Sequence, residues 1–202
     1  MLPPRRRILL GTLAATLALS VIYLQIRSPK EQQLQLLETL SGEADLHIQN
    51  SKITQFGANG RIKYLLISSE IFNFEESGLT LLKTPELTLY QPNGPPWKMQ
   101  AEIGEIREQK KNNNYTELII LNKDVEIERY HPNGDYLTMK SEQLRLYPED
   151  NYAETDQDVS ISSHIGETTA AGLQGEIQVG ALSLFSSSTK RVHSIFLPQN
   201  IK

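Results

Sequence analysis

Apolar and charged residues alternate strictly along one stretch in the middle of the chain, from Asp124 to Tyr130. Val125 and Ile127 point one way, while the carboxylates Asp124, Glu126 and Glu128 point the other. A period of two is that of a β-strand with one wet face and one buried face. The sequence then predicts a turn at Pro132–Gly134, because proline presets φ and glycine accepts the positive φ that closes a type I turn with a bulge. Apolar residues return on alternate positions after the turn, so this stretch is predicted to be an antiparallel hairpin.

The same pattern occurs earlier in the chain, between Pro85 and Glu102. An aromatic residue again precedes Pro-Asn-Gly, followed by a large apolar residue, a methionine and a glutamate at matching positions. A fainter copy runs from Phe56 to Glu70, and a fourth begins at Asp158, at intervals of roughly 34 to 39 residues. Repeats at such intervals are typical of stacked supersecondary units. The centre of the protein is therefore predicted to be a set of hairpins that share one buried face.

The β pattern continues through most of the chain after Asp45, and no sustained helical period follows residue 41. About a dozen short strands joined by turns indicate a β-sandwich, a jelly roll or an elongated β-solenoid. Each strand has a single apolar face, so two sheets are expected to face each other at about 10 Å. Further strands are predicted at 61–67, 79–82, 85–90, 97–101, 102–108, 115–121, 144–147, 159–163, 173–179, 181–185 and 192–197, with a turn over 110–114.

The N-terminus predicts a membrane anchor. Residues 1–7 contain three arginines, and residues 8–26 carry no charge. As a helix, 8–26 would span about 28 Å, close to the hydrocarbon thickness of a bilayer. The arginines would hold the N-terminus in the cytoplasm by the positive-inside rule. A cleaved signal peptide with a site at Ala18-x-Ser20 is the alternative, although the apolar run continues past that site.

The rest of the chain is predicted to be a linker followed by a single domain. Residues 27–44 form the linker, in which 28–41 are either a short helix or a solvated tether, and 45–202 form the β domain. Hydrophobic residues make up 39% of the chain and charged residues 22%, as in globular proteins. A net charge of −4 argues against sequence-independent binding of nucleic acid. The absence of cysteine excludes disulfides, thiolate catalysis and cysteine-based zinc sites.

No catalytic, cofactor or metal-binding constellation is predicted. The chain lacks a phosphate-binding GxxxxGK loop, an HExxH zinc motif and a GxSxG nucleophile elbow. Its four histidines (His47, His131, His164 and His193) are scattered in the sequence. The carboxylates on Asp124, Glu126 and Glu128 fit a solvated strand face. Two kinds of working surface remain: an apolar seam between sheets that accepts a lipid chain, and an unpaired edge strand that pairs with a partner.

The order of these parts resembles the LptC family, the membrane-anchored components of lipopolysaccharide export. A basic N-terminus and one apolar span precede hairpins in which Leu82-Lys83-Thr84-Pro85-Glu86-Leu87 and Trp97-Lys98-Met99-Gln100-Ala101-Glu102 match the family pattern. Asn59–Gly60 with Tyr64 and Ser69–Glu70, and Gly180–Leu184 near the end, match as well. The resemblance covers residues 5 to about 197. The stretches 110–114 and 186–189 depart from it.

The resemblance implies a twisted, V-shaped antiparallel β-jelly roll on the periplasmic face of the inner membrane. Such a domain receives lipopolysaccharide from an ATP-driven transporter whose subunits carry jelly rolls of their own. It passes the lipid to a periplasmic bridge of similar jelly rolls, and it is not itself an enzyme. Joining jelly rolls edge to edge would keep an apolar groove continuous, which avoids exposing acyl chains to water at about 0.8 kcal/mol per CH₂.

Candidate site residues follow from both lines of reasoning. The family resemblance places Leu82 and Ala181 in the lipid groove, and strand alternation adds four inward residues, Trp97, Met99, Leu137 and Met139. For partners, Gly60 with Tyr64 matches the end of the domain that faces the transporter, and Gly166 lies near a second family glycine. Val192 and Ile195 belong to the last strand, the candidate edge for the periplasmic bridge. Two other functions stay open: an envelope scaffold with a closed β core, and a membrane-tethered hydrolase using strand-borne carboxylates.

Overall fold

The computed structural model describes residues 44–57, 59–92, 94–111, 114–177 and 180–197. They belong to one compact unit that begins at Ala44. The predicted span 8–26 and nearly all of the predicted linker lie outside the described residues. Within the described residues, no helix is long and apolar enough to cross a membrane.

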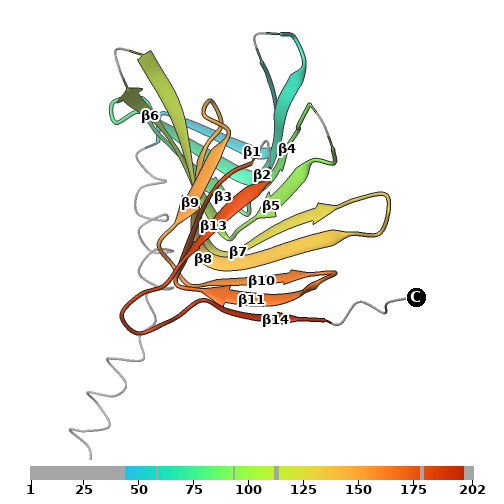
Figure 1. Cartoon of the computed structure of the whole chain (residues 1–202). Coiled ribbons are helices and arrows are strands. Elements are labelled where there is room, and N and C mark those ends of the chain that lie inside the picture. Colours follow the sequence, from blue (N-terminus) through green and yellow to red (C-terminus); the bar gives the residue numbers. More distant parts are fainter. Residues whose placement is uncertain (1–43, 58, 93, 112–113, 178–179, 198–202) are drawn as a thin grey trace, which may run out of the picture. The chain divides into compact units, whose positions relative to one another are not determined.

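Every regular element of this unit is a β-strand, which confirms the all-β prediction (Figure 1). In order, the strands are β1 (Leu46–Phe56), β2 (Ile62–Phe74), β3 (Leu79–Lys83), β4 (Glu86–Leu89), β5 (Trp97–Gln100), β6 (Ile103–Lys111), β7 (Asn114–Tyr130), β8 (Tyr136–Tyr147), β9 (Tyr152–Thr155), β10 (Val159–Ser163), β11 (Gly166–Ala170), β12 (Gly172–Glu176), β13 (Ala181–Phe185) and β14 (His193–Phe196).

All pairings are antiparallel, and the strands form one continuous 14-stranded sheet. The sheet is bent into two layers because long strands pass from one layer to the other. The first part of β7 pairs with β6 and its second part with β5, and β2 pairs in the same way with β4 and then β3. Layer A contains β3, β6, β9, β12 and β13, and layer B contains β4, β5, β10, β11 and β14. The two facing sheets expected from the one-sided strands are therefore two layers of one sheet, which folds over without breaking.

The bend follows a line that we call the corner, marked by unusual backbone angles. Asn50, Thr84, Lys123 and Asp124 have φ between 44° and 65°, which non-glycine residues rarely adopt. In β7 the register with β8 shifts between Asn122 and Val125, so Lys123 and Asp124 form a bulge. The sequence predicts separate strands on either side of this bulge, whereas the structure has one long strand that turns through it.

The hairpin predicted from Pro132–Gly134 is confirmed in detail. The Gly134 amide donates to the His131 carbonyl at 3.0 Å, and Gly134 has φ of 93°. Gly94 in the matching turn has φ of 101°. The two copies pair β4 with β5 and β7 with β8, and β5 also pairs with β7, so the repeated hairpins lie side by side in layer B.

Candidate functional site

The interior between the two layers is apolar and is built from the predicted inward faces. The register places Leu87, Met99, Ile127, Met139 and Ile161 in one row across layer B. Each of these side chains is buried, and the row belongs to a core that also includes residues of layer A. Alternation along the strands thus predicts which side of layer B faces inward.

A small cavity lies where the two layers meet. Its volume is about 20 Å³, and apolar side chains with Gly175 line it. Layer B contributes Trp97, Met99, Ile127 and Met139 to its wall, and the rest comes from Leu144, Ala153, Leu173, Ile177 and Leu182. A water molecule needs roughly 10–15 Å³, so this space is far too small for an acyl chain. A lipid could enter here only if the layers moved apart.

Polar contacts hold the layers together on the side opposite the corner, which we call the open side. Trp97 Nε1 in layer B donates to the Ile177 carbonyl at 3.2 Å. The Tyr64 hydroxyl donates to Glu117 Oε1 at 2.9 Å, joining β2 of layer B to the layer-A part of β7. Nearby, Lys63 Nζ lies 2.9 Å from Glu149 Oε1. Between described residues, the two layers are joined on the open side by these two hydrogen bonds and this ion pair, each of which contributes little stability.

Glu117 and Tyr64 have shifted pKa values because their contact is partly withdrawn from water. Burial raises the pKa of Glu117, and the nearby Glu149 raises it further, although the hydrogen bond from Tyr64 opposes the shift. Burial and the Glu117 carboxylate raise the pKa of Tyr64. Protonation of Glu117 therefore takes place at a higher pH than for an ordinary carboxyl group.

The apolar interior reaches solvent at both ends of the sheet. On β1, Ile48 and Ile53 belong to the inward rows yet are each 38% exposed. At the other end, Phe196 of β14 is 70% exposed. Within the described residues, β1, β13 and β14 each pair on one side only, so their other backbone edges are unpaired. Both ends therefore combine exposed apolar side chains with free strand edges.

The predicted groove residues fall in different surroundings. Trp97, Met99 and Met139 line the cavity, and Leu137 is partly buried against the core. Leu82 is fully buried next to the corner, packed against Gly104 of β6. The structure differs from the prediction at Ala181, which is exposed, while its neighbour Leu182 lines the cavity. Because strand side chains alternate, only one of these two neighbours can face the interior.

The residues predicted to contact partners also lie in different surroundings. Gly60 lies in the turn between β1 and β2 with φ of 73°. Tyr64 differs from its predicted role, because it is 4% exposed and its hydroxyl is used inside the protein. Val192 and Ile195 are exposed at 38% and 55%. Gly166 packs against β14 itself, since a Cβ there would lie 2.0 Å from the Ile195 carbonyl oxygen.

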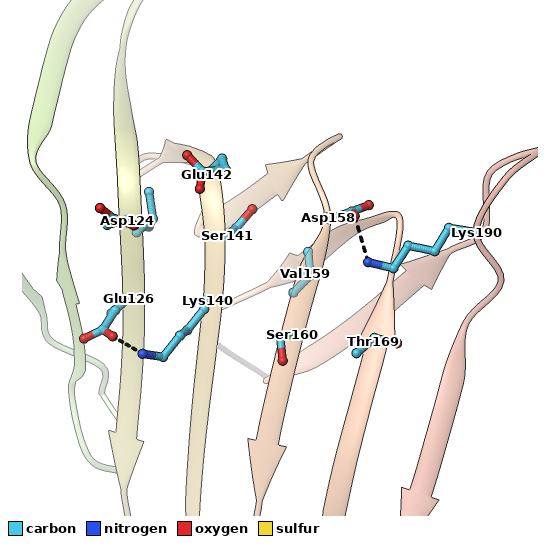
Figure 2. Close-up of a pocket in the computed structure, with 11 residues that line it drawn as sticks. Asp124, Glu126, Lys140, Ser141, Glu142, Asp158, Val159, Ser160, Thr169 and Lys190 are labelled. Carbon is cyan, nitrogen blue, oxygen red and sulfur yellow. Dashed lines mark hydrogen bonds and ion pairs between the residues drawn. The ribbon is translucent and has the colours of Figure 1, made fainter. Parts of the chain in front are cut away.

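A hollow lies on the outer face of layer B, and charged groups line it (Figure 2). It measures about 380 Å³. Figure 2 shows Lys140 paired with Glu126 and Lys190 paired with Asp158. The distance from Lys190 Nζ to Asp158 Oδ2 is 2.8 Å. The hydrogen bond from Lys140 lowers the pKa of Glu126, and Gln100 contributes to the shift. A general acid needs a raised pKa, so this carboxylate is adjusted in the opposite direction.

Sequence reasoning missed two groups on the inward faces, Glu117 and Arg129. Both stand at inward positions of the alternating pattern, two residues from Ile119 and Ile127 respectively. A charged residue at an apolar position was the available signal. The role of such a charged residue depends on which residues lie across the interior from it, and the sequence pattern does not give those residues.

Comparisons with known proteins agree with this architecture. The structure is similar to the crystal structure of LptH from Pseudomonas aeruginosa, described as the LptA homologous periplasmic component of the conserved lipopolysaccharide transport device. The TM-score is 0.52 at 10% sequence identity, and the match covers 67% of this chain and 95% of that one. This likeness shows a shared fold. No curated protein sequence matches the chain.

A family model described as "Lipopolysaccharide-assembly, LptC-related" matches residues 10–192, which is most of the chain. The match covers both repeated hairpins, the corner and the strands from β1 to β13. The chain therefore belongs to the LptC-related family of lipopolysaccharide-assembly proteins, and its role is in lipopolysaccharide transport in the cell envelope.

Proposed function

We propose that the interior between the layers binds the acyl chains of lipopolysaccharide and passes the lipid from one end of the sheet to the other. The observation that carries this proposal is an apolar interior with exposed apolar side chains at both ends, Ile48 and Ile53 on β1 and Phe196 on β14. A core that serves stability alone gains nothing from reaching solvent at two opposite edges. In this proposal the chain binds and transfers lipid and catalyses no reaction.

Residues 8–26 anchor the protein in the inner membrane, with 1–7 in the cytoplasm and the domain 45–202 in the periplasm. The uncharged run of nineteen residues behind three arginines supports this orientation. The linker 27–44 then keeps the domain close to the membrane that supplies the lipid.

Each end of the sheet takes a different partner. The β1 end, near Gly60, receives lipid from the jelly-roll domains of an inner-membrane ABC transporter. The β14 end, with Val192 and Ile195, adds a strand of a periplasmic bridge protein to its free edge. Edge-to-edge pairing supplies main-chain hydrogen bonds and aligns one apolar interior with the next. The likeness to a periplasmic transport component with the same fold supports this arrangement.

Entry of an acyl chain requires the two layers to separate, because the cavity is only about 20 Å³. Opening exposes apolar surface, and the entering lipid covers it again. Each buried CH₂ contributes about 0.8 kcal/mol, so a chain of several carbons offsets the loss of the few polar contacts on the open side.

Photo-crosslinkers at neighbouring strand positions test this proposal directly. Met139 faces the cavity, and the adjacent Lys140 faces the outer hollow. The two positions are neighbours on one strand, but their side chains lie on opposite faces of layer B. In cells, Met139 is expected to capture lipopolysaccharide and Lys140 is not. Ile127 and Glu126 form a second matched pair on β7. Equal capture of lipopolysaccharide at inward and outward positions would show that the interior is not the binding site.

The small cavity favours a second candidate, a scaffold with a permanently closed core. Native mass spectrometry of the full chain in detergent distinguishes the two functions. A scaffold would bind its partner proteins and carry no lipopolysaccharide at any stage, whereas a carrier would show a lipid-bound mass.

A further inference from the structure

Arg129 is a cation inside the rim of the apolar interior. On β7 it continues the inward positions of Val125 and Ile127, and it stands opposite Leu137 on β8. Its guanidinium carbon lies 4.8 Å from the centre of the Trp97 ring, in a cation–π contact. Trp97 is itself part of the cavity wall, so the charge lies directly beside the space proposed for lipid.

Two glycines from opposite layers leave room for this guanidinium. A Cβ on Gly94, in the β4–β5 turn of layer B, would lie 2.8 Å from one terminal nitrogen of Arg129. A Cβ on Gly180, in the β12–β13 turn of layer A, would lie 3.2 Å from the other. Both glycines have positive φ, at 101° and 70°. The guanidinium therefore lies between the layers on the open side, where they must part if a lipid enters.

Arg129 has no counter-ion in the described part of the chain. Its Nε is buried without a hydrogen-bond partner, and none of the ion pairs between described residues includes it. Burial lowers the pKa of this guanidinium, which nevertheless stays charged as arginines do in proteins. A buried donor without a partner is unfavourable, and a bound anion would supply the missing acceptor.

We propose that Arg129 binds a phosphate group of the lipid A headgroup while the acyl chains of the same molecule enter the interior beside Trp97. A guanidinium matches phosphate in a planar, two-pronged arrangement that a lysine cannot reproduce. The combination of a cation at the rim and an apolar space behind it fits an amphiphile with an anionic head. This inference rests on the proposed lipid-binding function and adds which chemical group is recognised, and by which residue.

The single tryptophan of the chain makes the proposal measurable, because Trp97 lies both under Arg129 and in the cavity wall. Intrinsic fluorescence of the full chain in detergent can be titrated with diphosphorylated lipid A and with the same lipid after removal of both phosphates. Arg129→Gln is expected to weaken binding of the phosphorylated lipid about 10- to 100-fold, the loss typical of a hydrogen bond to a charged group. Binding of the dephosphorylated lipid should change little, and Arg129→Lys should fall between.

Arg107→Gln is the matched control, because Arg107 is exposed and is hydrogen-bonded to its own neighbour Glu105. It should bind both lipids as the wild type does. If Arg129→Gln weakens both lipids equally or neither of them, the phosphate role is wrong although lipid binding stands. If the wild type binds neither lipid, the proposed function fails with it. Inorganic phosphate alone should leave the fluorescence unchanged, and an equal response to it would show a free-anion site instead of a lipid site.

Discussion

Replacing Gly166 by alanine is expected to release β14 from the sheet while the rest of the domain stays folded. The new Cβ would lie 2.0 Å from the Ile195 carbonyl oxygen, where the clash is with backbone that cannot rotate away. β14 pairs through four residues, and all four of its side chains are exposed, so apolar burial holds it only weakly. Roughly four hydrogen bonds, at about 0.5–1.5 kcal/mol each, stabilise the docked strand. Fixing its backbone costs about 1–2 kcal/mol per residue in conformational entropy. Docking of β14 is therefore nearly balanced and cannot absorb the clash.

Amide hydrogen exchange on the full chain measures this effect. In Gly166→Ala, residues 193–197 should lose protection, while the amides of Ile119 and Leu144 in the core should keep theirs. Gly134→Ala serves as the control, because Gly134 also has positive φ but has nothing within 4 Å of its Cβ position. Unchanged protection of β14 in Gly166→Ala would refute the steric argument, and loss of protection throughout the domain would refute the weak docking. The variant should also lose copurification with a periplasmic bridge protein if β14 is the docking edge.

Three further predictions concern the interior. Trp97→Phe keeps an aromatic ring but removes the hydrogen bond to Ile177. The free energy of unfolding, measured with denaturant, should therefore fall by about 1 kcal/mol. An unchanged value would mean that this contact does not hold the layers together. Leu82→Ala should lose about 2–5 kcal/mol by the same measurement because Leu82 is fully buried, and a smaller loss would indicate that the site collapses easily. The raised pKa of Glu117 means that the folded state binds its proton more tightly, so wild-type stability should fall as pH rises from the ordinary carboxyl value of 4.5 through the raised pKa. The amide side chain in Glu117→Gln can still accept the hydrogen bond from Tyr64. In this variant, stability should depend less on pH over the same range, and the unfolding temperature at neutral pH should be higher than in the wild type. Parallel pH profiles for the two proteins would contradict the raised pKa of Glu117.

Strand alternation and turn chemistry predicted much of the candidate site. Met99, Ile127 and Met139 face the interior as their spacing requires, and the Pro-Asn-Gly turns place glycine at positive φ. The family resemblance was less successful at Ala181 and Tyr64. On β13 the family pattern indicated the exposed neighbour of the inward Leu182, and Tyr64 is held inside by Glu117.

The sequence by itself determined the all-β class, the repeated hairpins and the inward faces of layer B, because these depend on local periodicity and on the φ preferences of glycine and proline. Only the tertiary structure decided that one sheet bends along the corner instead of splitting into two, since a bulge such as Lys123–Asp124 has no distinctive residue pattern. It also decided which inward residues face each other. Arg129 and Gly180 are far apart in the chain and on different layers, and only the fold brings the charge and the space for it together beside the apolar interior.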